Sequence, residues 1–185
     1  EHDVERGDSA IGVVGWGEGG MLALYAAALD TRIDAACVSG YFQPRERIWQ
    51  QPIDRNVFGL LEQFGDAELA SMIAPRPVII EAARHPDLPL LSGKGGAPAR
   101  LETPALSDVR KEFERAKDLV AKLPGGTPPL LVVSGDGAGP FLTETTLQDL
   151  LRQLVPQARV RAAQPAPEYQ AGPAFLPRRA QRQVQ

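Results

Sequence analysis

The residues whose types and spacing could do chemistry gather in one glycine-rich segment, Gly15-Trp16-Gly17-Glu18-Gly19-Gly20. It follows a short apolar run, residues 11–15, and precedes a run rich in alanine and leucine, residues 21–29. The first run is typical of a strand buried on both faces, and the second of a helix. A glycine-rich turn from strand to helix has two chemical interpretations: a dinucleotide-binding turn, or the nucleophile elbow of a serine hydrolase.

The dinucleotide interpretation uses Gly15, Gly17 and Gly20 as the three glycines of a G-x-G-x-x-G pattern. It also requires an acidic residue about 20 residues further on, at the end of the next strand, to bind the ribose. The next predicted strand, residues 33–39, has its nearby acid, Asp34, at the opposite end. Nucleotide binding therefore stays as the weaker alternative.

The elbow interpretation compares the segment with G-x-S-x-G and puts Gly17 in the position of the nucleophilic serine. The turn is tight, so the residues two before and two after the nucleophile, Gly15 and Gly19, are expected to be small. The nucleophile itself takes a strained backbone conformation, which glycine adopts without steric cost. The geometry can therefore survive without the serine, but glycine has no side chain that could attack a carbonyl carbon.

The rest of the sequence predicts the elements that must position this turn. Strands alternate with helices, which indicates a mostly parallel sheet with helices on both faces, an α/β fold. We expect one domain over residues 1–163, with a loop-rich insertion at about 85–104, and a linker or disordered tail over 164–185. After residue 40 we expect strands at 77–81, 130–134 and 158–162. We expect helices at 57–64 and 143–154, and a further helix that begins with Thr103 as its cap and Pro104 at its first position.

The run from Ile11 to Asp30 resembles the elbow of the acetyl-xylan-esterase/dienelactone-hydrolase-like branch of bacterial α/β hydrolases, where the usual form is G-Y-S-E-G-G. Residues 38–42, 56–61, 64–68 and 74–77 resemble that branch as well. The resemblance implies an α/β-hydrolase fold from the elbow strand onward, and an ancestral hydrolysis of small acyl esters of sugars or similar alcohols. It also implies that Glu18 offers its backbone N–H to an oxyanion hole.

The family's first strands are not matched, so the expected partners are the N-terminal part of a parent polypeptide and a small-molecule or carbohydrate ester. Without those strands, the elbow strand is left as an exposed sheet edge. Family relatives are often exported, but this chain carries no signal by which to judge its location.

By family resemblance, a triad acid follows the third strand and a histidine follows the last. Glu81, Asp87 and Asp136 are the candidate acids. His85 is the candidate base, although it follows the strand after which an acid is expected. No histidine follows the fourth predicted strand, so an elbow serine would lack a base there.

Composition narrows the function classes. A formal net charge of −3 gives no basic field for nucleic acid, and no apolar run of about 18 residues predicts a membrane span. Two distant histidines and one cysteine, Cys37, give no metal-ligand spacing, and no cofactor is expected. The sequence thus indicates a domain related to carboxylic-ester hydrolases and inactive as written; the alternatives are a non-catalytic binding or scaffold domain and, more weakly, a nucleotide-binding domain.

Overall fold

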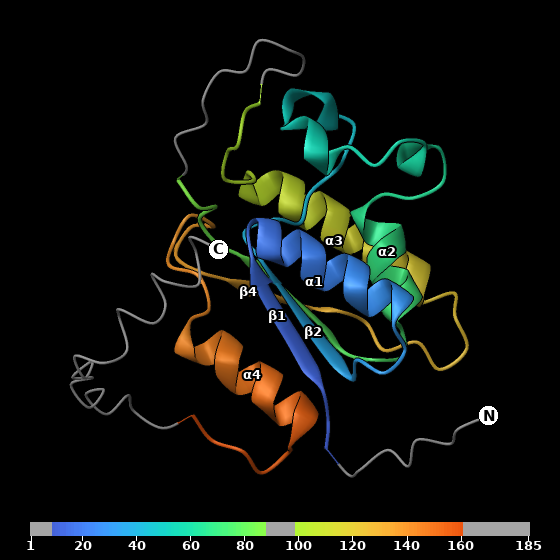
Figure 1. Cartoon of the computed structure of the whole chain (residues 1–185). Helices are drawn as coiled ribbons and strands as arrows, with labels where there is room; N and C mark the ends of the chain where they lie inside the picture. Colours follow the sequence, from blue (N-terminus) through green and yellow to red (C-terminus); the bar gives the residue numbers. More distant parts are fainter. Residues whose placement is uncertain (1–8, 88–98, 161–185) are drawn as a thin grey trace, which may run out of the picture.

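A four-stranded, all-parallel sheet forms the centre of the molecule (Figure 1). The computed structural model describes residues 9–87 and 99–160. The strands lie in chain order: β1 (Gly12–Trp16), β2 (Ala35–Ser39), β3 (Val78–Ala82) and β4 (Leu130–Val133). All carboxyl ends therefore meet at one edge of the sheet, the edge at which ligand sites of open α/β sheets form.

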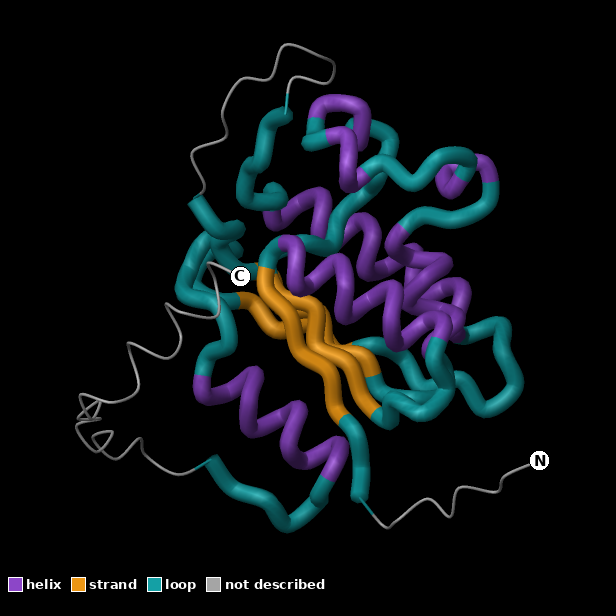
Figure 2. The backbone as a smooth tube through the Cα atoms, viewed as in Figure 1, coloured by secondary structure: helices purple, strands orange, loops and turns teal. Residues whose placement is uncertain are grey.

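Helices cover both faces of this sheet, as the sequence predicts (Figures 1 and 2). On one face lie α1 (Glu18–Leu29), α2 (Asp66–Ile73) and α3 (Leu106–Val120), and on the other lies α4 (Glu144–Leu154).

Successive residues of β2 point to opposite faces, so Ala36 and Val38 join the core under α1 to α3, whereas Ala35 and Cys37 join the core under α4. The Cys37 thiol is fully buried, and burial, with the nearby Glu81 carboxyl group, raises its pKa to about 12.

The segment between β2 and α2 differs from the prediction. The helix expected at 57–64 does not form; short 3-10 turns lie at Ile48–Gln50, Ile53–Arg55 and Leu60–Glu62 instead. Gly59 takes a left-handed φ of 74°, which interrupts any helix across it. The helix begins later, as α2, where Glu68 accepts a hydrogen bond from the Gly65 N–H at 2.7 Å.

The prediction that Thr103 caps α3 is also wrong, because Ala105 is the residue before the first turn of this helix. The Thr103 hydroxyl instead accepts a hydrogen bond from the His85 N–H at 3.1 Å, joining two loops. Thr143 does cap α4, as its hydroxyl accepts from the Thr146 N–H at 3.3 Å.

No strand forms at 158–160; residues 161–162 lie outside the described residues, as do the proposed tail and most of the insertion. Within the described ranges, no helix is long and apolar enough to cross a membrane.

Candidate active site

The turn from β1 into α1 has the backbone of an elbow. Gly17 precedes α1 with φ 57° and ψ −117°, a left-handed conformation that L side chains rarely adopt. Its N–H donates to the Ser39 carbonyl at 2.9 Å, and its carbonyl accepts from the Met21 N–H at 3.1 Å. A Cβ on Gly15 would lie 1.8 Å from the Gly19 carbonyl oxygen, so only glycine fits there.

The prediction that residue 19 must be small because the turn is tight is wrong. A Cβ on Gly19 would meet nothing within 4 Å, whereas one on Gly20 would lie 2.9 Å from the Ser39 carbonyl oxygen. The close approach behind the turn therefore involves Gly15 and Gly20. The reason is that α1 crosses the end of β2 at Gly20 and leaves Gly19 on its open side.

The space where a nucleophile side chain would begin is filled by Pro86. A Cβ on Gly17 would lie 2.5 Å from Pro86 Cδ and 2.7 Å from Pro86 Cγ. Real Cβ atoms do not approach other atoms this closely, and a proline ring cannot swing away as the end of a flexible side chain can. A serine at Gly17 would therefore require the Pro86 loop to move.

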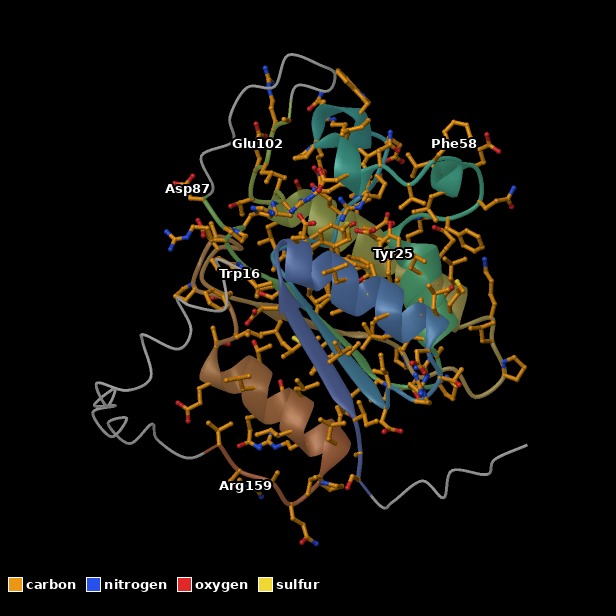
Figure 3. All side chains as sticks on the ribbon, viewed as in Figure 1. Trp16, Tyr25, Phe58, Asp87, Glu102 and Arg159 are labelled. Carbon is orange, nitrogen blue, oxygen red and sulfur yellow. The ribbon has the colours of Figure 1, made fainter. Side chains whose placement is uncertain are left out.

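Three hydrogen bonds hold that loop in place. Trp16 donates its indole N–H to the Arg84 carbonyl at 2.6 Å, and the Arg84 N–H donates to the Gly139 carbonyl at 3.0 Å. The third is the His85 N–H to Thr103 bond. Trp16 also stacks on Phe141, with ring centroids 3.8 Å apart, and Figure 3 shows it at the end of β1. Trp16 is thus a packed aromatic that ties β1 to the loops after β3 and β4.

His85 lies beside the same position, since its Nε2 would be 3.3 Å from a Cβ on Gly17. Its Nδ1 lies 2.8 Å from the Pro86 carbonyl, which can only accept, so Nδ1 carries the proton. Nε2 is then the acceptor and takes a hydrogen bond from Arg55 Nη2 at 3.3 Å. Burial lowers the pKa of the imidazole, and the positive charge of Arg55 lowers it further. The ring is neutral near pH 7, with its basic nitrogen already occupied.

Arg55 was not singled out from the sequence, yet its guanidinium lies within hydrogen-bond distance of His85 Nε2. The side chain is 2% exposed and donates from Nε and Nη2 to Glu18 Oε2, at 3.2 and 3.1 Å. The Glu18 backbone N–H, in the first turn of α1, has no hydrogen-bond partner in the described part of the chain, as an oxyanion donor requires. Its role in an oxyanion hole stays a prediction.

The candidate acids lie apart from His85. Glu81 is 1% exposed and accepts hydrogen bonds from Ser39 Oγ (2.5 Å), Leu142 N (2.7 Å), Thr143 N (3.1 Å) and the Thr146 hydroxyl. Its oxygens are therefore engaged at the amino end of α4, where a carboxylate is favoured.

Asp87 and Asp136 are exposed, and Asp136 accepts from the Ala138 N–H of its own turn at 3.3 Å. Among the described residues, none of the three candidate acids hydrogen-bonds to the His85 ring, and their catalytic roles stay predictions.

A polar groove of about 280 Å³ lies beside this loop, between the segment after β2 and the start of α3. Thr103, the acceptor for the His85 N–H, is part of its wall. Its charged lining residues are three acids and three bases, which balance: Glu46, Glu102, Asp108, Arg47, Arg100 and Lys111. Figure 3 shows Glu102 on the same side of the molecule as Asp87.

Comparison with known proteins gives a distant likeness. No family model matches this chain, and no curated protein matches it. Among solved structures, a glucuronoyl esterase from Solibacter usitatus is similar at 14% sequence identity and a TM-score of 0.42. The likeness covers 77% of this chain but only 42% of that esterase, so the chain spans less than half the length of the structure it matches.

Proposed function

We propose that this chain is a catalytically silent relative of carboxylic-ester hydrolases, from the acetyl-xylan-esterase/dienelactone-hydrolase-like branch, in which the elbow serves as a structural turn. The observation that carries the proposal is the Pro86 ring beside Gly17. An active elbow needs an open space in front of the nucleophile for the acyl carbon and for attack. Here the Pro86 ring occupies the start of that space, and Gly17 has no side chain to act as a nucleophile.

The neighbouring groups support the same proposal. A general base must have a free lone pair within hydrogen-bond reach of the nucleophile. The Nε2 lone pair of His85 is taken by Arg55, and the buried Glu81 carboxylate is engaged at the start of α4. The absence of a nucleophile at Gly17, the hydrogen bond to His85 Nε2 and the hydrogen bonds to Glu81 together argue against acyl transfer by this chain.

A binding role is the second candidate, and the polar groove favours it. The groove presents donors and acceptors with balanced charge, which suits a neutral ligand with many hydroxyl groups, because each hydroxyl both donates and accepts. Such a ligand is a carbohydrate or its ester. Nucleotide binding has less support, because a ribose is normally bound by an acidic residue at the end of the second strand. Here β2 ends at Ser39, whose hydroxyl donates to Glu81.

The test compares four proteins on p-nitrophenyl acetate and on acetylated xylan fragments: the unsubstituted chain, Gly17→Ser, Pro86→Gly and the double variant Gly17→Ser/Pro86→Gly. We expect background rates from the first three and at most a small burst of acylation from the double variant. Thermal melts check that each variant folds. Steady turnover by the unsubstituted chain would contradict the proposal, since it would require another nucleophile.

Binding is tested separately by titrating the unsubstituted chain with xylotriose in a calorimeter, with Lys111→Ala as the groove variant. A heat of binding that is lost in this variant supports the binding role. Equal heats in both proteins remove the groove from consideration.

A further inference from the structure

The indole of Trp49 is open to solvent, with an exposed fraction of 59%. The hydrogen bonds and ring contacts within the described part of the chain include the indole of Trp16 but not that of Trp49. Trp16 is therefore used to hold loops together, whereas the fold makes no such use of Trp49. A single exposed apolar side chain is common on protein surfaces, so the position of Trp49 decides what it can do.

The backbone that carries Trp49 is fixed at the wall of the polar groove. Trp49 is the middle residue of a 3-10 turn, which Ile48, at 6% exposed, anchors in the protein. The Gln50 N–H donates to the Arg47 carbonyl at 2.9 Å, and the Gln50 carbonyl accepts from the Arg100 N–H at 2.7 Å. Arg47, Gln50 and Arg100 all line the groove. Because neighbouring Cα atoms are about 3.8 Å apart, the indole begins next to this wall and forms part of the rim.

The groove and the indole offer the two kinds of surface that a sugar ring needs. A sugar ring has a flat face of C–H groups, which is apolar, and an edge of hydroxyl groups, which donate and accept hydrogen bonds. Three glutamine amides line the groove, those of Gln43, Gln50 and Gln51, and each amide both donates and accepts. The apolar members of the described lining are Pro44 and Ala105, which offer little flat surface. The indole at the rim supplies the flat apolar surface that this lining lacks.

We propose that Trp49 is a stacking platform for one sugar ring of an oligosaccharide whose next unit lies in the polar groove. This inference rests on the binding role proposed above, and it adds the residue that selects a ring with an apolar face. The groove, at about 280 Å³, is at the small end of ligand sites, which run from about 300 to 1,000 Å³. It therefore holds part of such a ligand, and a neighbouring unit lies over the rim.

A proline-rich peptide is the main competing ligand, because proline rings also pack on exposed aromatic side chains. Its rings carry no hydroxyl groups, so it would cover the groove and leave several of the amides and charged side chains there without partners. A saccharide provides a hydroxyl group for such partners at nearly every ring carbon. The polar character of the groove thus favours the saccharide.

Calorimetric titration with xylotriose tests the platform. Trp49→Ala should weaken binding by about tenfold, because the stacking contact is lost. Trp49→Phe should retain part of the affinity, since it keeps a flat apolar ring. Phe58→Ala is the matched control: Phe58 is a fully exposed aromatic residue of the same segment, and Figure 3 shows it well apart from Glu102 of the groove wall. Circular dichroism and thermal melts establish that each variant is folded.

Tryptophan fluorescence provides a second measurement, because the chain has two tryptophans and Trp16 is stacked on Phe141. Xylotriose should shift the emission of the unsubstituted chain to shorter wavelengths and protect it from quenching by acrylamide. Both changes should be absent in Trp49→Phe, in which Trp16 is the remaining tryptophan.

The outcomes separate this inference from the binding role on which it rests. Xylotriose binding that is lost in Lys111→Ala but unchanged in Trp49→Ala overturns the platform and leaves the binding role intact. No heat from the unsubstituted chain contradicts the binding role itself, and the platform with it. Binding of a tri-proline peptide in place of xylotriose, lost in Trp49→Ala, also overturns the proposal, because the indole would then select a peptide.

Discussion

Two arginines from the segment between β2 and α2 are buried to a similar degree, 4% exposed for Arg45 and 2% for Arg55. Arg45 makes a two-point ion pair with Asp66, which is fully buried, and lies 3.7 Å above the Tyr41 ring. Arg55 bonds to one oxygen of Glu18, which is 49% exposed. The first pair has no access to water, whereas the second has a hydrated partner.

The Arg45 pair connects two elements of the fold, whereas Arg55 lies beside the candidate site. Asp66 is the first residue of α2 and also accepts from the Gln43 N–H, so the Arg45 pair joins the loop after β2 to this helix. Arg55 instead contacts His85 next to Gly17, where burial lowers the pKa of the imidazole and the charge of Arg55 lowers it further. A buried guanidinium therefore does not by itself identify a functional site; what differs between these two arginines is the exposure of the partner carboxylate.

The largest expected effect comes from removing the enclosed cation. Arg45→Met leaves the Asp66 carboxylate buried without its counter-ion, which should lower the free energy of unfolding by about 3–5 kcal/mol. Urea denaturation followed by circular dichroism measures this loss. The double variant Arg45→Met/Asp66→Leu, which removes both charges, should recover most of it. A loss below about 1 kcal/mol in the single variant would remove the distinction drawn between the two arginines.

The second expectation concerns pH, because the Arg55 region contains His85, an imidazole whose ordinary pKa of 6.5 lies near neutrality. The pKa of folded His85 lies below its ordinary value of 6.5, so the unfolded chain binds more protons at acid pH. His85 should therefore reduce stability progressively as the pH falls below about 6.5, by at most about 1.4 kcal/mol per pH unit.

Chemical denaturation at several pH values between 7 and 5.5 measures that slope. In His85→Gln the corresponding part of the slope should disappear. An unchanged slope in this variant would mean that other groups cause the acid sensitivity.

A smaller stability change is expected for Arg55→Met. Its partner Glu18 is half exposed and can be hydrated when the arginine is gone, so the free energy of unfolding should stay within about 1 kcal/mol. The pKa of His85 should rise, because a nearby positive charge is removed. Two-dimensional NMR titration of the imidazole follows this rise, and a pKa that does not move would show that Arg55 has no electrostatic role at the ring.

The smallest effect is expected for Glu18→Gln. This change removes the charge of a half-exposed side chain but leaves an amide oxygen that can still accept from the buried Arg55 guanidinium, so the stability loss should be about 0.5 kcal/mol or less and should shrink at high salt. Thermal melts at low and high salt provide the measurement. A loss as large as that of Arg45→Met would mean that the Glu18–Arg55 pair is as enclosed as the Arg45–Asp66 pair.

Local sequence patterns predicted most of the sheet and its helices. The apolar runs that became β1 to β4 were each predicted to within two residues, because a strand buried on both faces must be continuously apolar. Patterns failed at two places for different reasons. Thr103 makes a long-range hydrogen bond to His85 rather than capping α3, and Gly59 takes a left-handed conformation that interrupts the helix predicted across it. Arg55 was missed because a loop arginine between polar neighbours carries no sign of burial.

The sequence by itself determined the α/β class and the glycine-rich turn after the first strand, because each depends on neighbouring residues: runs of apolar side chains, and glycines at positions 15, 17 and 20. Only the tertiary structure decided what surrounds Gly17. Pro86 and His85 reach it from a loop far away in the chain, Arg55 reaches His85 from another loop, and no local pattern specifies how those loops pack. The proline ring in front of the elbow and the occupied histidine nitrogen therefore became visible only once the chain was folded.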